Sequence, residues 1–252
     1  MSSADPTGTV QPTPSGPTSG IPTGYRARIR SFTRRGERMP PRHQAAYDAL
    51  AGTYVIDVPR HDGSTTVDPD FSLDVAAVYG RTGPLVVEVG PGSGDALIAG
   101  AKALPDTNFL ALEVWRPGIG QCLSRLIDDP LPNLRFVEVD AEVGLATMLG
   151  EGAAAEVWTY FPDPWPKRRH HHRRIVRPEF ADTVCRVLEP GGLWRLATDI
   201  DDYAQHMRRV LEVHPGLELV SSERAALRPV TRFERRGTEV GRTISDLAYQ
   251  RR

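Results

Sequence analysis

The sequence predicts an α/β fold with a mostly parallel sheet, a C-terminal antiparallel strand and helices on both faces. From Gly83 onward, short apolar runs alternate with helical patterns, which is typical of strand–helix–strand units. The chain has 252 residues, of which 40% are hydrophobic and 25% charged, so its composition is that of an ordinary globular protein. This length suits one large catalytic domain.

The N-terminal part differs in composition from the rest. Residues 1–24 contain 18 Pro, Gly, Ser or Thr and a single charged residue, Asp5, so this segment predicts a disordered tail. Residues 25–82 are interpreted as a basic arm with a helical extension, because seven arginines face one acid, Glu37, between Tyr25 and His43. A weakly ordered, solvated leader is the alternative for this arm. The catalytic domain is expected at 83–252.

The elements of that domain follow from hydrophobic periodicity and turn residues. Apolar runs predict strands at 85–89, 109–113, 134–139, 157–161 and 193–198. Helical patterns between and after them predict helices at 95–104, 118–127, 178–188 and 201–213, and the third begins with a proline in its first turn. The runs 217–221 and 243–249 are expected to be the final strands, as an antiparallel edge pair.

Charge, cysteine content and hydropathy exclude several classes of protein. With 31 Lys+Arg against 32 Asp+Glu, the net charge is −1 and gives no sign of nucleic acid binding. Cys122 and Cys185 are isolated, which favours buried thiols over a disulfide framework or a zinc site. No apolar run approaches the roughly 18–20 residues that cross a bilayer, and no signal peptide pattern begins the chain. We therefore expect a cytoplasmic protein without a membrane partner.

A glycine-rich turn follows the strand at 85–89, and its glycines are Gly90, Gly92 and Gly94. Glycine lets the backbone approach a ligand closely. A dinucleotide fingerprint would place a glycine where Asp95 stands, so the turn does not predict a pyrophosphate site. Glu88 would repel a phosphate but attract an amino group. The pattern resembles the first motif of class I S-adenosylmethionine-dependent methyltransferases, although such a turn also occurs in other α/β enzymes.

Two further acids end the next two strands. Glu113 ends the run 109–113, where a carboxylate can accept both ribose hydroxyls of an adenosine, and Asp140 follows the run 134–139, where it can contact the adenine amino group. A solvated acid is the alternative for each. Because ligands of open α/β sheets bind at the carboxyl ends of strands, Glu88, Glu113 and Asp140 are expected around one crevice.

The segment after the fourth strand carries the most specific motif, Phe161-Pro162-Asp163-Pro164-Trp165, followed by Lys167. The prolines on both sides of Asp163 restrict the backbone and hold the carboxylate in place. This segment resembles the bacterial tRNA (guanine-N7-)-methyltransferase family, as do Ala197-Thr198-Asp199 and the segment 231–237. The resemblance covers about 83–252 and implies the Rossmann-like class I methyltransferase fold and S-adenosylmethionine as cofactor.

The same resemblance implies roles for individual residues. Asp163 is the expected catalytic residue and also lies in the expected cofactor-binding set with the three acids and three glycines above. The expected substrate-binding residues are Lys167, Asp199, Thr231, Arg232, Phe233 and Glu234. Lys167 is one of only two lysines among 31 basic residues, which suggests that a compact ammonium is needed there.

A basic run beginning at Lys167 has six fixed positive charges and no acid up to Arg177, so it is expected to engage a polyanion. The expected RNA-contacting residues are Arg168, Arg169, His170, His171, His172, Arg173 and Arg174. Adjacent histidines point in different directions and lack a nearby Asp or Cys, so we expect no metal site. The triple histidine departs from the family pattern, which often has Asn or Lys there.

The expected activity is methyl transfer from S-adenosylmethionine to N7 of the variable-loop guanine of tRNA, conventionally number 46. Two alternatives stay open: a class I methyltransferase of exocyclic amino groups on RNA or DNA bases, and a non-catalytic RNA-binding relative. The amino-group enzymes carry Asp/Asn-Pro-Pro-aromatic, whereas Trp165 stands here at the place of their second proline. The expected partner is tRNA, and the chain is expected to be a monomer or a homodimer.

Overall fold

The computed structural model describes residues 38–61, 63 and 65–252 of the chain. The tail expected at 1–24 lies outside the described residues, as does most of the basic arm. The described part of 25–82 contains two helices, α1 (Pro41–Tyr54) and α2 (Val75–Tyr79).

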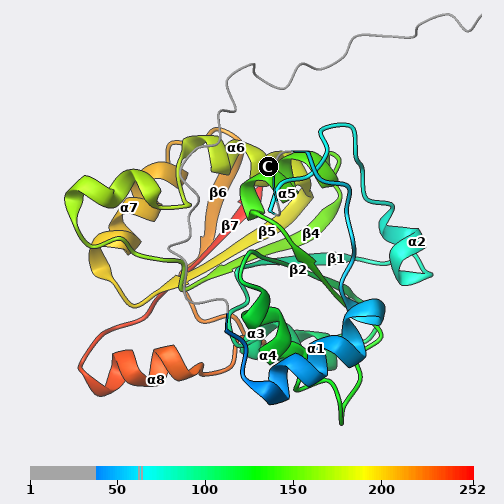
Figure 1. Cartoon of the computed structure of the whole chain (residues 1–252). Coiled ribbons are helices and arrows are strands. Elements are labelled where there is room, and N and C mark those ends of the chain that lie inside the picture. Colours follow the sequence, from blue (N-terminus) through cyan, green and yellow to red (C-terminus); the bar gives the residue numbers. More distant parts are fainter. Residues whose placement is uncertain (1–37, 62, 64) are drawn as a thin grey trace, which may run out of the picture.

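A seven-stranded sheet forms the centre of the molecule (Figure 1). Its order is β3-β2-β1-β4-β5-β7-β6. The strands are β1 (Leu85–Val89), β2 (Asn108–Glu113), β3 (Leu134–Glu138), β4 (Ala154–Tyr160), β5 (Leu188–Thr198), β6 (Leu217–Ser221) and β7 (Ser245–Arg251). The first five strands pair in parallel, whereas β7 pairs antiparallel with both β5 and β6. The predicted fold class is confirmed, including the antiparallel strand near the C-terminus.

The strand predictions differ from the structure mainly at one place. β5 begins at Leu188, not at 193, because Gly191 and Gly192 form part of the strand instead of a turn. The pairing with β4 is irregular there: Ala154 pairs with Leu188, and the next pair joins Glu156 to Leu193. Two consecutive glycines predict a turn before the strand, but the irregular pairing between β4 and β5 accommodates them inside it.

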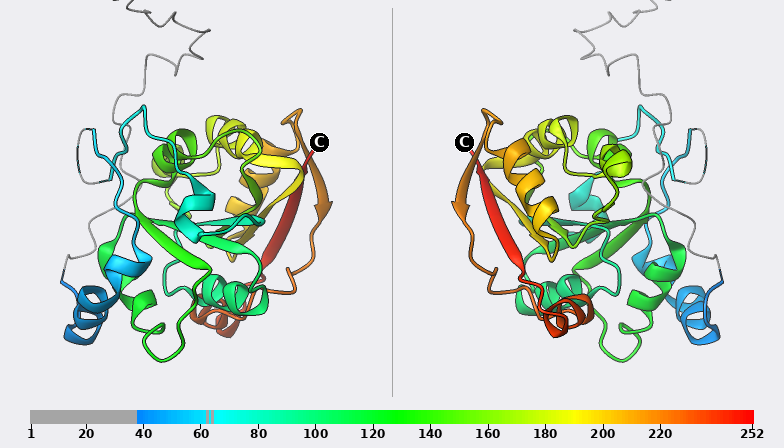
Figure 2. Two further views of the ribbon diagram at one scale, coloured as in Figure 1. Left: turned by 90° about the vertical axis from the view of Figure 1, so that its right-hand side faces the viewer. Right: turned by 90° about the vertical axis from the view of Figure 1, so that its left-hand side faces the viewer.

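Helices cover both faces of the sheet (Figures 1 and 2). Besides α1 and α2, they are α3 (Asp95–Ala103), α4 (Arg116–Leu123), α5 (Ala141–Met148), α6 (Pro178–Val187), α7 (Asp201–Leu211) and α8 (Arg232–Glu239), with a 3₁₀ helix η1 (Arg168–Arg173). Buried residues of α1, α3 and α4 share one apolar cluster, and those of α5, α6 and α7 share the other. The side chains of β1 alternate between the clusters, since Val87 and Val89 belong to one and Val86 to the other.

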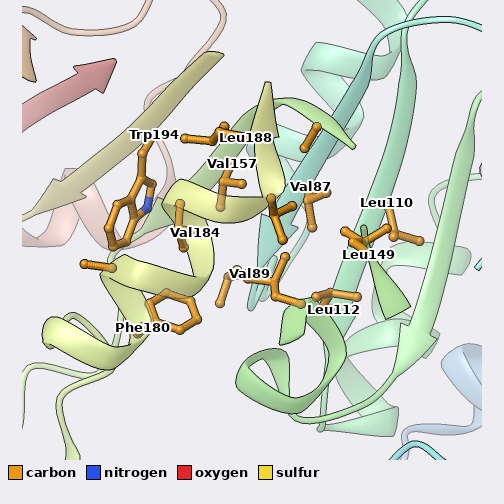
Figure 3. Packing of buried hydrophobic residues seen from close by; sticks show 14 of the residues in the cluster. Val87, Val89, Leu110, Leu112, Leu149, Val157, Phe180, Val184, Leu188 and Trp194 are labelled. Carbon is orange, nitrogen blue, oxygen red and sulfur yellow. The ribbon is translucent and has the colours of Figure 1, made fainter. Parts of the chain in front are cut away.

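The larger cluster fixes the helices that follow β3 and β4 (Figure 3). Phe180 of α6 packs edge-on against Trp194 of β5, with ring centroids 5.7 Å apart, a distance usual for aromatic pairs. The Trp194 indole N–H donates to Thr159 Oγ1 at 3.0 Å, so its polar group is satisfied in the core. This packing holds β4 and β5 as rigid supports for the loops that leave their carboxyl ends.

Two helices of the catalytic domain were not predicted. α5 contains Gly144, whose place is explained by close packing, because a Cβ there would lie 2.9 Å from Val139 Cγ1. α8 is strongly polar and contains Gly237, so no apolar run marks it in the sequence. Its N-terminus is instead marked by Thr231, whose Oγ1 accepts a hydrogen bond from the Glu234 N–H at 3.1 Å.

The segment between α1 and α2 borders the carboxyl end of β3. Ile56 N–H donates to the Phe136 carbonyl at 2.8 Å, and the Arg60 guanidinium donates to the Glu138 carbonyl at 2.7 Å. Asp140 N–H donates to the Thr65 carbonyl at 2.9 Å. This segment therefore forms a wall beside the strand end that carries Asp140.

Candidate active site

The glycine turn leaves β1 at the carboxyl edge of the sheet. Gly90, Gly92 and Gly94 have φ angles of 66°, 57° and 73°, in the left-handed region that glycine adopts without strain. A Cβ on Gly94 would lie 2.7 Å from Cys122 Sγ, so this glycine is required for the close approach of α3 and α4. A Cβ on Gly90 or Gly92 would meet no heavy atom within 4 Å, so these two border open space.

Glu88 is a buried acid directly before this turn, with 3% of its surface exposed. Its Oε2 is buried and accepts no hydrogen bond from the described residues. Burial, and then the charges of Asp95 and Glu113, raise the pKa of Glu88 to about 8. A buried acceptor without a donor is costly, so the site favours a ligand that brings a cationic or hydrogen-bond-donating group to Glu88.

Glu113 and Asp140 lie at the ends of the neighbouring strands, as the sequence indicates. Glu113 is 8% exposed, and its Oε1 accepts the Trp115 N–H at 2.9 Å. Asp140 caps α5, because its Oδ1 accepts the Glu142 N–H at 3.0 Å. Both carboxylates are thus held by backbone N–H groups at the carboxyl edge of the sheet, Glu113 on the strand beside β1 and Asp140 after the next strand.

These residues fit S-adenosylmethionine. The unsatisfied oxygen of Glu88 suits the amino group of the methionine part, and the open space at Gly90 and Gly92 leaves room for a ligand close to the backbone. Glu113 stands at the end of β2, which is the usual place for an acid that binds ribose hydroxyls.

The loop after β4 carries Asp163 and has an unusual backbone. Phe161 and Trp165 have φ angles of 51° and 46°, and among the residues described they are the non-glycine residues with positive φ. Such conformations are rare for aromatic residues and occur where the surrounding structure imposes them. Phe161 N–H donates to the Ala197 carbonyl at 2.8 Å, which continues the pairing with β5 into the loop. Asp163 itself is exposed.

The basic run continues from this loop into η1. Lys167 precedes the helix, and Lys167, Arg168, Arg169 and His172 are exposed. His170 packs edge-on against Trp165 with ring centroids 6.0 Å apart, and the Arg173 guanidinium lies 4.9 Å from the same ring. Burial, followed by the charges of Arg173 and Arg169, lowers the pKa of His170. The lowered pKa of His170 favours its neutral form, so this ring adds little to the positive charge that the lysine and arginines give to the surface.

Arg174 differs from the other expected RNA-contacting residues. It is 1% exposed, and its guanidinium is enclosed by the Asp163 loop and α7. In this structure Arg174 cannot reach an RNA phosphate, so its expected place in the RNA-contacting set requires correction. The sequence could not distinguish it from Arg173, because both belong to one continuous basic run.

The expected substrate-binding residues of the C-terminal part have defined partners. The Arg242 guanidinium donates to Asp199 Oδ2 at 2.6 Å, and Gly237 of α8 lies against the same carboxylate. Thr231 caps α8. Arg232 and Phe233 belong to α8, but the structure does not describe their side chains.

Glu234 is 4% exposed and belongs to a buried ion network. It pairs with Arg224 and, at 2.6 Å, with Arg228, whose guanidinium also forms a two-point ion pair with Asp246 of β7 at 2.8 Å. The role expected for Glu234 as a direct substrate contact is therefore corrected to one in holding α8 against the sheet. Sequence reasoning missed Arg228, because a single arginine between Leu227 and Pro229 gives no signal of burial.

Two classes of feature are not found in the described part of the chain. No helix there has both the length and the apolar character needed to span a bilayer. Over the same residues, no three His, Cys, Asp or Glu side chains gather in an arrangement that could hold a metal ion.

Comparisons with known proteins agree with the motifs. A family model described as "Putative methyltransferase" matches residues 82–247. The tRNA (guanine-N(7)-)-methyltransferase of Cutibacterium acnes is 48% identical over 227 residues, covering 88% of this chain and 82% of that protein. The enzyme of the same name from Nocardioides sp. is 45% identical and covers 89% of this chain and 88% of that protein. The one from Paenarthrobacter aurescens is 46% identical over 74% of this chain and 62% of that protein.

Solved structures resemble the fold at low sequence identity. The 16S rRNA methyltransferase KamB has a TM-score of 0.53 at 17% identity, covering 77% of this chain and 99% of that chain. The 16S rRNA (adenine(1408)-N(1))-methyltransferase of Catenulisporales acidiphilia, solved with its cosubstrate SAM, has a TM-score of 0.51 at 16% identity and covers 74% of this chain and 92% of that chain. The fold expected from the sequence, that of Rossmann-like class I methyltransferases, is thereby confirmed.

Proposed function

The chain belongs to the tRNA (guanine-N(7)-)-methyltransferase family, and on that premise we propose that it methylates N7 of the variable-loop guanine of tRNA, position 46. One observation supports this proposal above the others. Three neighbouring strands bring acids to the carboxyl edge of the sheet: β1 carries Glu88, β2 carries Glu113, and the loop with Asp163 follows β4.

S-adenosylmethionine, when bound, supplies the methyl group as part of a sulfonium cation. Glu88, Gly90, Gly92, Glu113 and Asp140 are the residues that would hold it. Glu88 receives the amino group, the glycines give the ligand access to the backbone, and Glu113 accepts ribose hydroxyls. Asp140 holds the adenine end beside the segment between α1 and α2.

Asp163 orients the guanine and stabilises the positive charge that develops on it. The N7 atom of guanine has a free lone pair at neutral pH, so the reaction requires no general base. The protein must instead align N7 with the methyl group and provide negative charge where positive charge appears. The prolines around Asp163 and the unusual backbone of Phe161 and Trp165 give this carboxylate a fixed position.

The tRNA meets the exposed basic surface of η1, which begins directly after the Asp163 loop. Lys167, Arg168 and Arg169 face solvent there and can contact phosphates on both sides of the target nucleotide. Such contacts offset the cost of extracting the guanine from its stack. We further propose that the protein acts in the cytoplasm, as a monomer or a homodimer.

The test of the reaction is direct. Purified protein is incubated with bulk tRNA and methyl-labelled S-adenosylmethionine, and the nucleosides are analysed. We expect 7-methylguanosine as the labelled product. A label on an exocyclic amino group would identify the alternative class of methyltransferase, and no incorporation together with retained tRNA binding would identify a non-catalytic RNA-binding protein.

The role of Asp163 is tested by two variants. Asp163→Asn keeps an oxygen acceptor on the same loop, so we expect it to retain more activity than Asp163→Ala, with the loss in the chemical step. Single-turnover rates with both substrates saturating measure this, and Asp128→Ala, in an exposed loop before β3, is the matched control. Equal and complete inactivation of both Asp163 variants would show a strict need for negative charge, and near-normal turnover by Asp163→Ala would remove Asp163 from the reaction.

A further inference from the structure

We propose that Arg174 is a positioning residue for methyl transfer, which holds the Asp163 loop in its reactive shape through the Pro164 carbonyl. This inference rests on the proposed function of Asp163. Arg174 is part of the basic run, but it acts from inside the protein and not through the RNA.

The contact with the loop is specific. Arg174 Nε donates a hydrogen bond of 2.9 Å to the carbonyl oxygen of Pro164, the residue that follows Asp163. Pro164 has no N–H, and its ring fixes φ, so the orientation of its carbonyl largely determines how the chain passes from Asp163 to Trp165. One donor on this oxygen therefore constrains the peptide next to the carboxylate.

The guanidinium is itself anchored at other points. One of its nitrogens, Nη2, pairs with Asp202 of α7 and lies 3.2 Å from His171 Nε2. The guanidinium carbon, Cζ, lies 4.8 Å from the centre of the Tyr203 ring. Since Asp202 and Tyr203 belong to the first turn of α7, Arg174 connects the Asp163 loop to a helix packed on the sheet.

The backbone of the loop explains why such an anchor is needed. Phe161 and Trp165 hold positive φ angles, which are strained conformations for non-glycine residues. Each of these two rings also has a guanidinium stacked on it, Arg228 on Phe161 at 5.3 Å and Arg173 on Trp165 at 4.9 Å. Arg174 is the one of the three that bonds to the backbone between them. Without it, the loop would relax toward less strained conformations.

The test compares Arg174→Met, Arg174→Lys and Asp202→Asn with the wild type. Arg195→Met is the matched control, because Arg195 of β5 is also partly buried and its guanidinium bonds to Glu156 of β4. We expect the single-turnover rate of Arg174→Met to fall about 100-fold, because small misplacements of catalytic groups cause losses of this size. S-adenosylmethionine affinity should stay within about twofold, because Arg174 does not contact the residues that hold the cofactor. Arg174→Lys and Asp202→Asn should fall between Arg174→Met and the wild type, and Arg195→Met should match the wild type.

A second measurement needs no activity. Trypsin cleavage after Lys167, Arg168 or Arg169, followed by mass spectrometry of the fragments, reports whether the loop and η1 are released. We expect several-fold faster cleavage in Arg174→Met than in Arg195→Met at equal thermal stability. If Arg174→Met does not fold, Arg174→Lys and Asp202→Asn test the proposal in its place. Asp202 is more than half exposed, so its replacement should leave the protein folded.

Three outcomes would overturn the proposal. They are single-turnover rates within twofold of the wild type in the folded Arg174 variants, trypsin cleavage as slow as in the wild type, or a loss of S-adenosylmethionine affinity in Arg174→Met as large as its loss of rate. Failure of the proposed function is distinguishable from these, because then the wild type itself would form no 7-methylguanosine, while the trypsin experiment would still report on the loop.

Discussion

Glu88 is a buried carboxyl group whose surroundings favour binding of a cation. It lies in a central strand, where burial, and then the charges of Asp95 and Glu113, raise its pKa to about 8. Its folded-state pKa exceeds the ordinary value of 4.5, so the folded protein holds a proton that the unfolded chain releases. The unfolding free energy of the cofactor-free protein should therefore fall as the pH rises from about 4.5 to about 8.

Cofactor binding should show the opposite dependence. A cationic ligand favours ionised Glu88, so S-adenosylmethionine affinity should rise up to about tenfold per pH unit between pH 6 and pH 7, with release of a proton. Calorimetric titration in two buffers of different ionisation enthalpy measures both the affinity and the number of protons released on binding. Glu88→Gln cannot ionise and is the control. Equal pH dependence in Glu88→Gln would show that another group is responsible.

Glu113 is predicted to act on the cofactor alone. Glu113→Ala removes a charged acceptor for two hydroxyls and should weaken S-adenosylmethionine binding by about 1.5–3 kcal/mol, with tRNA affinity nearly unchanged. Glu138→Ala is the matched control, since Glu138 pairs in register with Glu113 on β3 but bonds to Arg116. Calorimetry on both folded variants provides the measurement. Unaltered cofactor affinity in Glu113→Ala would exclude this residue from the pocket.

Residue types and spacing predicted the positions of the three acids, because strand ends are readable from apolar runs. Residue types and spacing could not predict which polar residues are buried. Arg174 and Glu234 belong to segments that look solvent-exposed, yet both side chains are buried. Burial of a charge depends on the partner that neutralises it, and Asp202 and Arg228 are recognisable as partners only in the folded chain.

At the scale of elements, η1 presents a compact basic surface. Replacing Lys167, Arg168 and Arg169 together by serine should weaken tRNA binding and lower the slope of log affinity against log salt by roughly 0.7–0.9 per lost phosphate contact. The control replaces Lys102 and Arg252, which are exposed and paired with acids away from η1. The measurement is tRNA affinity at several salt concentrations for the wild type and both variants. A slope equal to the wild type would make η1 an ordinary solvated surface.

The network around Arg228 joins α8 to β7. Arg228→Met would leave Glu234 and Asp246 buried without their shared cation, so the free energy of unfolding should fall by about 3–5 kcal/mol. Urea unfolding followed by circular dichroism measures the change. Arg252→Met, which removes the exposed partner of Glu218 on β6 of the same sheet, should cost much less. Similar losses in the two variants would contradict a special role for the network.

Elements with a strong apolar pattern were predicted well, and those held by tertiary contacts were not. β1 and β6 have the bounds expected from the sequence, because their apolar runs end at glycine or polar residues. α8 has few apolar residues, so it depends on tertiary contacts such as the Glu234–Arg228 ion pair and the packing of Gly237 against Asp199.

For the whole molecule, the cofactor should act as a stabilising ligand. S-adenosylmethionine at about a hundred times its Kd should add about 2.7 kcal/mol, or roughly 5–10 °C in Tm for a chain of this length. Thermal unfolding with and without the ligand measures the shift, and NAD is the control ligand because Asp95 interrupts a dinucleotide fingerprint. A comparable shift with NAD would contradict the assigned cofactor.

The order of the last two strands bears on how the protein is made. β6 precedes β7 in sequence, but β7 lies between β5 and β6 in the sheet. When a ribosome has delivered β6 and α8, the strand that must bond to β6 and supply Asp246 to Arg228 is still to come. The parallel half of the sheet, with Glu88 and Glu113, can therefore form during translation, whereas α8 must wait for β7. The cofactor pocket would be assembled on the nascent chain before the region around Asp199 is complete.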